Sequence, residues 1–352
     1  MYKQNDQKNN KSPYYYLSAY RSHLMGFAIL WVVWFHSRVY LNFFSVSLLN
    51  NFFSFVKTIG YGGVDVFLLV SGMGIYNSLE KNEISKYIRN RIKRIMPVWW
   101  TYLIICILLG HFVFNINFSK MEIIGFATYT GYWLDMSNQG NWYVYAIILF
   151  YLISPIFYSL LKNSKNKLTM VTLLVTIAII VSVAFWESSK LIVFSRVPIY
   201  IIGMYVFTLK DFSISKKHWF GMLAFFIFGI ALLFVFIVYF YDYLWSYGLW
   251  WYPFITLAPT LSLLVTKGFD IMHKRFNYLL SVLSILGKSS LEILLVSDAM
   301  FNNFKNINIT IVSENLTNLF IVLISIIVGI LFHFLLDFII MQQEVILKRQ
   351  SG

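Results

Sequence analysis

The sequence of 352 residues has few charged residues and almost no cysteine. Only 12% of its residues are Asp, Glu, Lys or Arg, whereas 59% are hydrophobic and 20% are aromatic. A soluble globular protein of this composition would lack the polar side chains that cover a surface in water. The single cysteine, Cys106, excludes a disulfide within the chain and leaves no cysteine spacing typical of a metal site. We therefore predict an integral membrane protein without a bound metal.

Long polar segments are also missing, because apolar stretches recur along the whole chain with short polar loops between them. A helix needs about 20 apolar residues to cross a hydrocarbon core of about 30 Å. Residues 121–134 are too short and too polar to cross and are expected to lie at the membrane surface. The pattern predicts an all-α membrane bundle of about ten transmembrane helices, over residues 24–44, 58–79, 96–112, 142–161, 168–187, 191–209, 218–240, 248–266, 279–302 and 317–341.

Basic residues are distributed unequally between the two sets of loops. Of the 28 Lys and Arg residues, 21 lie in loops on the side of the two termini and only four lie on the other side. The positive-inside rule then places both termini in the cytoplasm. We predict one membrane domain, 21–342, between cytoplasmic tails at 1–20 and 343–352. Because topology explains most of the net charge of +13, membrane lipids are expected as surroundings and nucleic acid is not expected as a partner.

Ionisable residues inside the predicted spans are costly and are candidates for function. With a rise of about 1.5 Å per residue, His36 lies about 18 Å from the cytoplasmic end of its span, Asp65 about 22 Å, and Arg196 and Glu292 about 20 Å each. Scattered structural residues have no reason to coincide in depth. We interpret the four as candidates for one site, although a histidine bonded to a nearby hydroxyl and an aspartate paired within the bundle remain the alternative.

Other charged residues in the spans favour structural roles. Arg38 lies about 200° around the helix from His36 and is expected to face another direction. Lys288 and Glu292 are four residues apart, a spacing that allows an ion pair within one helix. That pair alone would explain both residues.

A basic run, "KYIRNRIKRIMPVWW" at 86–100, precedes a span that is expected to open with Pro97, a residue favoured in the first helical turn. One interpretation is a positive-inside anchor with Trp99 and Trp100 in the aromatic belt. The other is a phosphate-binding collar, because guanidinium groups make bidentate contacts with phosphate. Position alone does not separate the two. The basic residues in question are Arg89, Arg91, Lys93 and Arg94.

Five segments and the first span resemble the motifs of acyltransferase family 3, in the order found in that family. The first span carries the pair "FH", so the resemblance covers about 20 to 341. The segments are "GYGGVDVFLLVSGMGIY" (60–76), "RNRIKRIMP" (89–97), "NWYVYAIILFYLISP" (141–155), "RVPIYIIGM" (196–204) and "LGKSSLEILLV" (286–296).

The resemblance implies an integral membrane enzyme that takes an acyl group, usually acetyl, from cytoplasmic acyl-CoA. It delivers this group to a hydroxyl of a cell-surface glycan, so the implied co-substrate is acetyl-CoA and the implied partner is an extracytoplasmic glycan. The histidine of the first span, His36, is the implied general base, and Asp65 and Arg196 match two further motifs. The implied location is the cell membrane of a bacterium. The donor phosphates are assigned to the basic run, Arg89, Arg91, Lys93 and Arg94.

The sequence departs from the family pattern at two positions. Met25 stands where the family has an arginine, and Ser297 stands where a late histidine is common. Arg21, one helical turn earlier, and His23 are candidates to compensate for the missing arginine. In the expected mechanism, Asp65 orients the imidazole of His36 as the acid of a triad does. The sequence leaves three alternative functions open, which are a glycan transporter or flippase, a polysaccharide polymerase and a membrane receptor.

Overall fold

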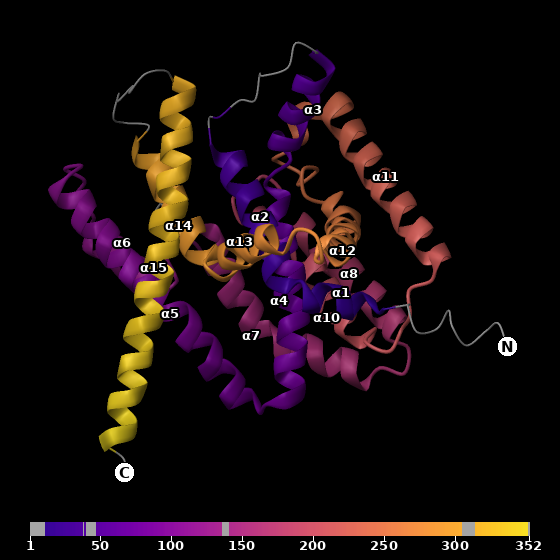
Figure 1. Ribbon diagram of the computed structural model, residues 1–352, viewed down its shortest axis with the longest axis horizontal. Helices are drawn as coiled ribbons and strands as arrows, with labels where there is room; N and C mark the ends of the chain where they lie inside the picture. Colours follow the sequence, from indigo (N-terminus) through magenta and orange to yellow (C-terminus); the bar gives the residue numbers. More distant parts are fainter. Residues whose placement is uncertain (1–10, 38, 40–46, 136–140, 305–313, 351–352) are drawn as a thin grey trace. The chain divides into compact units, whose positions relative to one another are not determined.

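A computed structural model of the protein describes residues 11–37, 39, 47–135, 141–304 and 314–350, and every regular element in those ranges is a helix (Figure 1). The all-α prediction is therefore confirmed for the described residues. The chain divides into two compact units, each of which draws on three stretches of sequence. Unit 1 comprises Met1–Leu24, Gly62–Arg89 and Ala146–Ser281, and unit 2 comprises Met25–Tyr61, Asn90–Tyr145 and Val282–Gly352.

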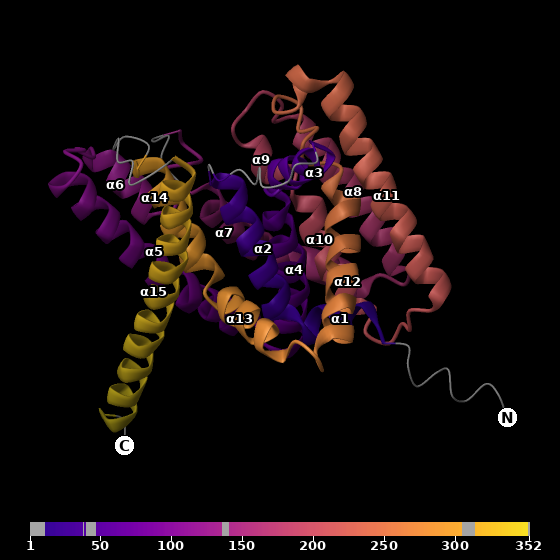
Figure 2. The same cartoon turned by 45° about the horizontal axis from the view of Figure 1, so that its top comes forward.

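Unit 1 is built around the pair of helices α4 and α10. Helix α4 packs more extensively against α10 than against any other helix of unit 1, α10 also packs against α8, and α12 lies against both α4 and α11 (Figure 2). The helices of unit 1 are α1 (Pro13–Ala19), α4 (Gly62–Lys81), most of α7 (Trp142–Asn163), α8 (Lys167–Val183), α9 (Leu191–Phe194), α10 (Val197–Thr208), α11 (Lys216–Tyr239), the short 3₁₀ helix η2 (Tyr241–Tyr243) and α12 (Phe254–Met272).

Two glycines allow α4 and α10 to approach closely. A Cβ atom at Gly72 of α4 would overlap the backbone oxygen of Tyr200, and one at Gly203 of α10 would overlap the backbone oxygen of Leu69. Small residues at a crossing let helix backbones touch, and van der Waals contact is a main source of helix association in a membrane. The sequences "SGMG" and "IIGM" therefore determine where these two helices cross.

Unit 2 contains a long hairpin of α14 and α15, which pack against each other (Figure 2). Gly329 permits this contact, because a Cβ there would lie 2.6 Å from the Cα of Ile293. The helices of unit 2 are most of α2 (Arg21–His36), α3 (Ser47–Thr58), most of α5 (Ile84–Phe112), α6 (Lys120–Ala127), most of α13 (Asn277–Lys288), α14 (Ser290–Phe304) and α15 (Glu314–Gln350).

Seven helices in the described ranges are long and apolar enough to cross a membrane, or eight if α13 and α14 form one span bent by 71°. These helices agree with a polytopic membrane protein. Helix α8, with 17 residues, and helix α2, with 16, are shorter than a full span. The count of ten spans, the cytoplasmic termini and the single domain 21–342 stay predictions.

The helix that contains the predicted span 96–112 is longer than the span, because α5 begins at Ile84. Pro97 therefore lies inside the helix, and its expected place in the first helical turn is wrong. Arg, Lys and Ile are compatible with helix, so the basic run continues the helix although it is too polar to count as membrane-spanning. An interior proline removes one backbone N–H, which membrane helices tolerate when other groups satisfy the freed carbonyl.

The predicted span 248–266 is wrong at its start, because α12 begins at Phe254. The preceding residues form turns instead. Gly248 has a φ of +73°, in the region that side chains disfavour, and Pro253 immediately precedes the helix. The aromatic residues between them are apolar by composition but belong to a loop.

Candidate functional site

Asp65 and Arg196 form a buried ion pair in unit 1. Asp65 lies in the first turn of α4 and Arg196 is the residue that precedes α10. The Arg196 Nε atom lies 3.2 Å from Asp65 Oδ1, and the two side chains are 1% and 0% exposed. The structure thus brings together two of the residues that the sequence placed at one depth.

The environment of the pair compensates its charges only in part. The Arg196 guanidinium donates a hydrogen bond to the Ile192 carbonyl at 2.9 Å and lies 5.0 Å from the ring centre of Trp251. Among the described residues, neither carboxylate oxygen of Asp65 has a hydrogen-bond partner of good geometry. A buried ion pair recovers its desolvation cost only when further hydrogen bonds satisfy its remaining lone pairs. Stability alone therefore does not account for this pair, which makes it a candidate for function.

His36 is the last residue of α2, in unit 2, and its side chain is exposed. The Phe35 ring packs edge-on against Tyr61 at 5.7 Å, and the Ser37 hydroxyl donates a hydrogen bond to the Trp34 carbonyl at 2.8 Å. These contacts hold the end of α2, so His36 is the last residue of its helix. Residues 38 and 40–44 of the predicted span 24–44 lie outside the described residues. Arg38 lies outside the described residues, and the role of His36 as a base stays a prediction.

The four basic residues assigned to the donor lie on one helix, α5. At about 100° per residue, Arg89 and Lys93 share one side of α5 and Arg91 and Arg94 share another. Arg89, Lys93 and Arg94 are exposed, whereas Arg91 is half-buried. The run therefore presents basic groups in two directions, and its role in phosphate binding stays a prediction.

Trp99 and Trp100 of α5 do not act only as an aromatic belt. The Trp99 indole is 2% exposed and donates a hydrogen bond to the Phe126 carbonyl at 3.0 Å, and the Trp100 indole donates one to the Ala127 carbonyl at 3.3 Å. Both carbonyls lie at the end of α6, where the last carbonyls of a helix have no partner within it. These bonds attach α6, the segment predicted to lie at the membrane surface, to α5.

The sequence model of one protein family, described as an acyltransferase domain, matches residues 23–337. The chain belongs to acyltransferase family 3. A search of the curated proteins and a search of the solved structures each found no match. The family match, which covers most of the chain, shows a membrane acyltransferase and favours this class over the transporter, polymerase and receptor alternatives.

Two residues of this acyltransferase relate to its departures from the family pattern: Arg21, a candidate to compensate for the missing arginine, and Ser297, which stands in place of the late histidine. Arg21 lies in unit 1 with its guanidinium over α4, because a Cβ at Gly74 would be 3.2 Å from both of its terminal nitrogens. Arg21 thus directs its charge onto α4, one turn before Met25. Ser297 is 1% exposed and its hydroxyl donates to the Leu294 carbonyl at 3.0 Å, so this side chain is engaged with its own helix.

The acyltransferase has a second polar cluster in unit 2, which the sequence reasoning missed. Glu292 is 5% exposed, and its Oε1 atom lies 3.0 Å from Nδ1 of His333, whose Nε2 atom lies 3.5 Å from Asp337 Oδ2. Lys288 is the last residue of α13 and Glu292 lies in α14, so the two residues do not share one helix as the predicted ion pair requires. The sequence did offer one indication of this cluster, because Glu292 and His333 lie in consecutive predicted spans, where ionisable residues are uncommon.

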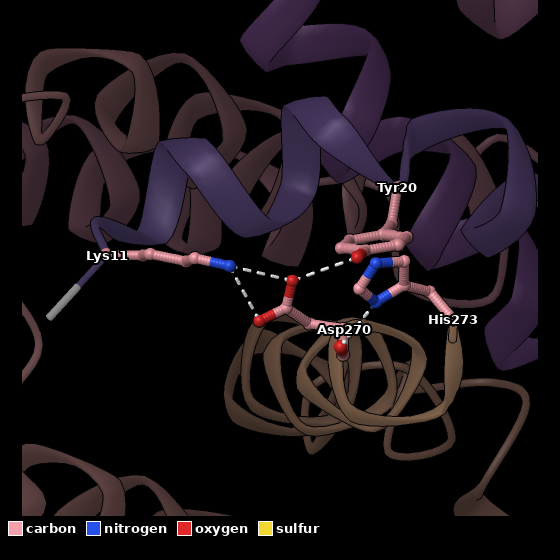
Figure 3. A network of polar contacts seen from close by, with 4 residues as sticks. All are labelled: Lys11, Tyr20, Asp270 and His273. Atoms are coloured by element: carbon pink, nitrogen blue, oxygen red, sulfur yellow. Dashed lines mark hydrogen bonds and ion pairs between the residues drawn. The ribbon is translucent and has the colours of Figure 1, made fainter. Parts of the chain in front are cut away.

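A polar network in unit 1 attaches the N-terminal segment of the acyltransferase to the end of α12 (Figure 3). Lys11 Nζ donates to both Asp270 carboxylate oxygens at 2.8 Å, and the Tyr20 hydroxyl donates to Oδ1 at 2.9 Å. Burial and the hydrogen bond to Asp270 raise the pKa of Tyr20 to about 12. Burial disfavours the charge of Lys11, yet the contact with Asp270 outweighs this and raises the Lys11 pKa.

Metal chemistry has no evident site in this part of the acyltransferase. Among the described residues, no group of His, Cys, Asp and Glu side chains is arranged to hold a metal ion.

Proposed function

We propose that the protein transfers an acetyl group from cytoplasmic acetyl-CoA to a hydroxyl of an envelope polysaccharide outside the membrane. The observation that carries this proposal is the buried Asp65–Arg196 pair, which lies on two family motifs at the crossing of α4 and α10. Family membership supports acyl transfer in general. The choice of acetyl-CoA, of a hydroxyl acceptor and of a polysaccharide rests on the family resemblance.

The reaction requires a base and a positive environment for the developing oxyanion. We assign His36 to take the proton from the acceptor hydroxyl as its oxygen attacks the thioester carbonyl; the C–S bond then breaks and the CoA thiolate leaves and takes up a proton. An imidazole suits this task because its ordinary pKa lies near neutral pH. Arg196, held by Asp65, is assigned to stabilise the negative charge on the carbonyl oxygen.

The donor is assigned to the basic run of α5, where arginines offer bidentate contacts to phosphate. Arg89 and Lys93 form one group and Arg91 and Arg94 the other. The unequal distribution of basic residues supports cytoplasmic termini and hence a donor on the cytoplasmic side. The many Asn, Lys, Ile and Phe residues agree with an AT-rich bacterial genome, which supports a bacterial cell membrane.

The test is acetyl transfer by a variant without the base. With radiolabelled acetyl-CoA and an isolated envelope polysaccharide, His36→Ala should lose at least about 100-fold of the transfer rate, the usual contribution of a general base. His111→Ala is the matched control, because His111 is an exposed histidine whose ring bonds to Asn117, six residues away, at 3.1 Å. The control should retain the wild-type rate. Wild-type transfer by His36→Ala would overturn the assignment of the base.

A further inference from the structure

Two loops of unit 1 meet and expose a set of aromatic rings. The Glu187 N–H in the loop after α8 donates to the Ser246 carbonyl at 2.7 Å, and the Trp186 ring packs edge-on against Tyr247 with 4.9 Å between centres. Tyr243 packs beside Tyr247 at 5.5 Å. We use the name aromatic platform for Trp186, Tyr243, Trp245 and Tyr247.

Three of the four residues of the aromatic platform are exposed, and Tyr247 is half-buried. Trp186 is 42% exposed, Tyr243 53% and Trp245 57%. Such large apolar surfaces on two loops that touch each other indicate a contact with a partner or with lipid. The loop positions favour the outer side of the membrane, because the unequal distribution of basic residues assigns the loops after α8 and α11 to that side.

The same two loops carry acidic residues. Glu187 and Asp242 are exposed, and the Tyr247 hydroxyl donates to Glu187 Oε1 at 3.4 Å. The backbone of Glu187 has a φ of +62°, a conformation that is uncommon for a residue with a side chain. Its hydrogen bond to Ser246 maintains this conformation. The carboxylate of Glu187 is thereby held at the border of the rings.

Rings bordered by carboxylates match the chemistry of a saccharide. The electron-rich face of an aromatic ring attracts the C–H groups on the face of a pyranose, and carboxylates accept hydrogen bonds from its hydroxyls. Trp and Tyr are also common at membrane interfaces. Carboxylates beside the rings would repel anionic lipid headgroups, so they favour the saccharide.

The aromatic platform is connected to the buried ion pair. Trp245 packs edge-on against Trp251 at 5.5 Å, and Trp251 is the ring that lies 5.0 Å from the Arg196 guanidinium. A single buried indole, that of Trp251, therefore separates the exposed Trp245 from the Asp65–Arg196 pair. A ligand on Trp245 would approach the pair from the loop side of unit 1.

We propose that the aromatic platform binds the saccharide acceptor and that Trp245 is its main stacking residue. This inference rests on the proposed function, because it identifies where the acceptor of the acetyl group binds. The test uses the full chain in bilayer discs and measures binding by equilibrium dialysis. The probes are radiolabelled β-1,4-linked tetrasaccharides of N-acetylglucosamine and of glucose, and acetyl-CoA consumption is measured in parallel.

We expect Trp245→Ala to weaken the binding of at least one tetrasaccharide by fivefold or more, and Trp245→Tyr, which keeps a ring, to stay within twofold of wild type. Glu187→Gln should weaken binding without changing the KM for acetyl-CoA. Tyr278→Ala is the matched control, because Tyr278 is 85% exposed on α13, outside the two loops. It should bind as wild type does.

Equal binding by wild type and Trp245→Ala, equal losses in Trp245→Ala and Tyr278→Ala, or no binding of either probe by wild type would overturn the proposal. Quenching of Trp245 fluorescence by brominated lipids, measured against Trp245→Phe, would assign the rings to the membrane interface and overturn it as well. Binding that depends on Trp245 without any acetyl-CoA consumption would support the aromatic platform but contradict the proposed acetyl transfer.

Discussion

The buried Asp65–Arg196 pair predicts an unusual pattern of stability. Arg196→Met should destabilise the protein by about 3–5 kcal/mol, because it leaves a carboxylate buried without its counter-charge. The magnitude follows from burial, since the two side chains are 1% and 0% exposed. The double variant Asp65→Leu/Arg196→Met removes both charges and should lie within about 1 kcal/mol of wild type or above it.

The assay is unfolding by sodium dodecyl sulfate in mixed micelles, followed by tryptophan fluorescence. Lys162→Met is the control, because Lys162 and Glu80 form an exposed pair at 3.7 Å and exposed pairs contribute little. If the pair is kept for catalysis, the double variant should be stable but inactive. A single variant that loses less than about 1 kcal/mol, or a double variant as unstable as the single one, would refute the reasoning.

Two further predictions concern the helix crossing and the N-terminal segment. Gly203→Ala should destabilise the protein by about 1–3 kcal/mol in the same assay, since the new methyl group overlaps the Leu69 backbone oxygen. Gly221→Ala, with nothing within 4 Å of the new atom, should be neutral or stabilising; equal losses in the two variants would contradict the close crossing. Tyr20 has a pKa raised to about 12, so the folded state retains a proton that the unfolded state releases as the pH rises from about 10. When the free energy of unfolding is measured at several pH values, wild type should lose stability faster than Tyr20→Phe between pH 10 and 12. Equal losses in the two proteins would show that the Tyr20 bond to Asp270 does not contribute to the pH dependence of stability.

Much of the helical framework follows from apolar run length. Helices α7 and α11 begin and end within about two residues of the predicted spans. The predicted span 191–209 instead divides into α9 and α10, with Arg196 between them. The sequence also predicted that Asp65 and Arg196 lie at the same depth, because a helix has a constant rise per residue. The close α4–α10 crossing supplies the lateral contact that depth alone does not specify.

The parts that sequence reasoning missed depend on other physical terms. The sequence did not predict the start of α5, because hydropathy marks only the apolar part of the helix and the basic run is polar. The residues of the basic run nevertheless have adequate helix propensity, so the helix includes them. The loop before α12 was taken as membrane because its aromatic residues are apolar, whereas Gly248 and Pro253 determine its turns. The contact of Glu292 with His333 joins residues 41 positions apart, and no local periodicity encodes such a contact.

The most direct measurement follows both products of the reaction at once. Purified protein in liposomes is given acetyl-CoA with a labelled acetyl group, with and without the envelope polysaccharide. We expect CoA release that depends on the polysaccharide, with one labelled acetyl group appearing on the polysaccharide for each CoA released. Movement of the polysaccharide across the bilayer with no CoA release and no label on the polysaccharide would contradict acetyl transfer as the function of this protein.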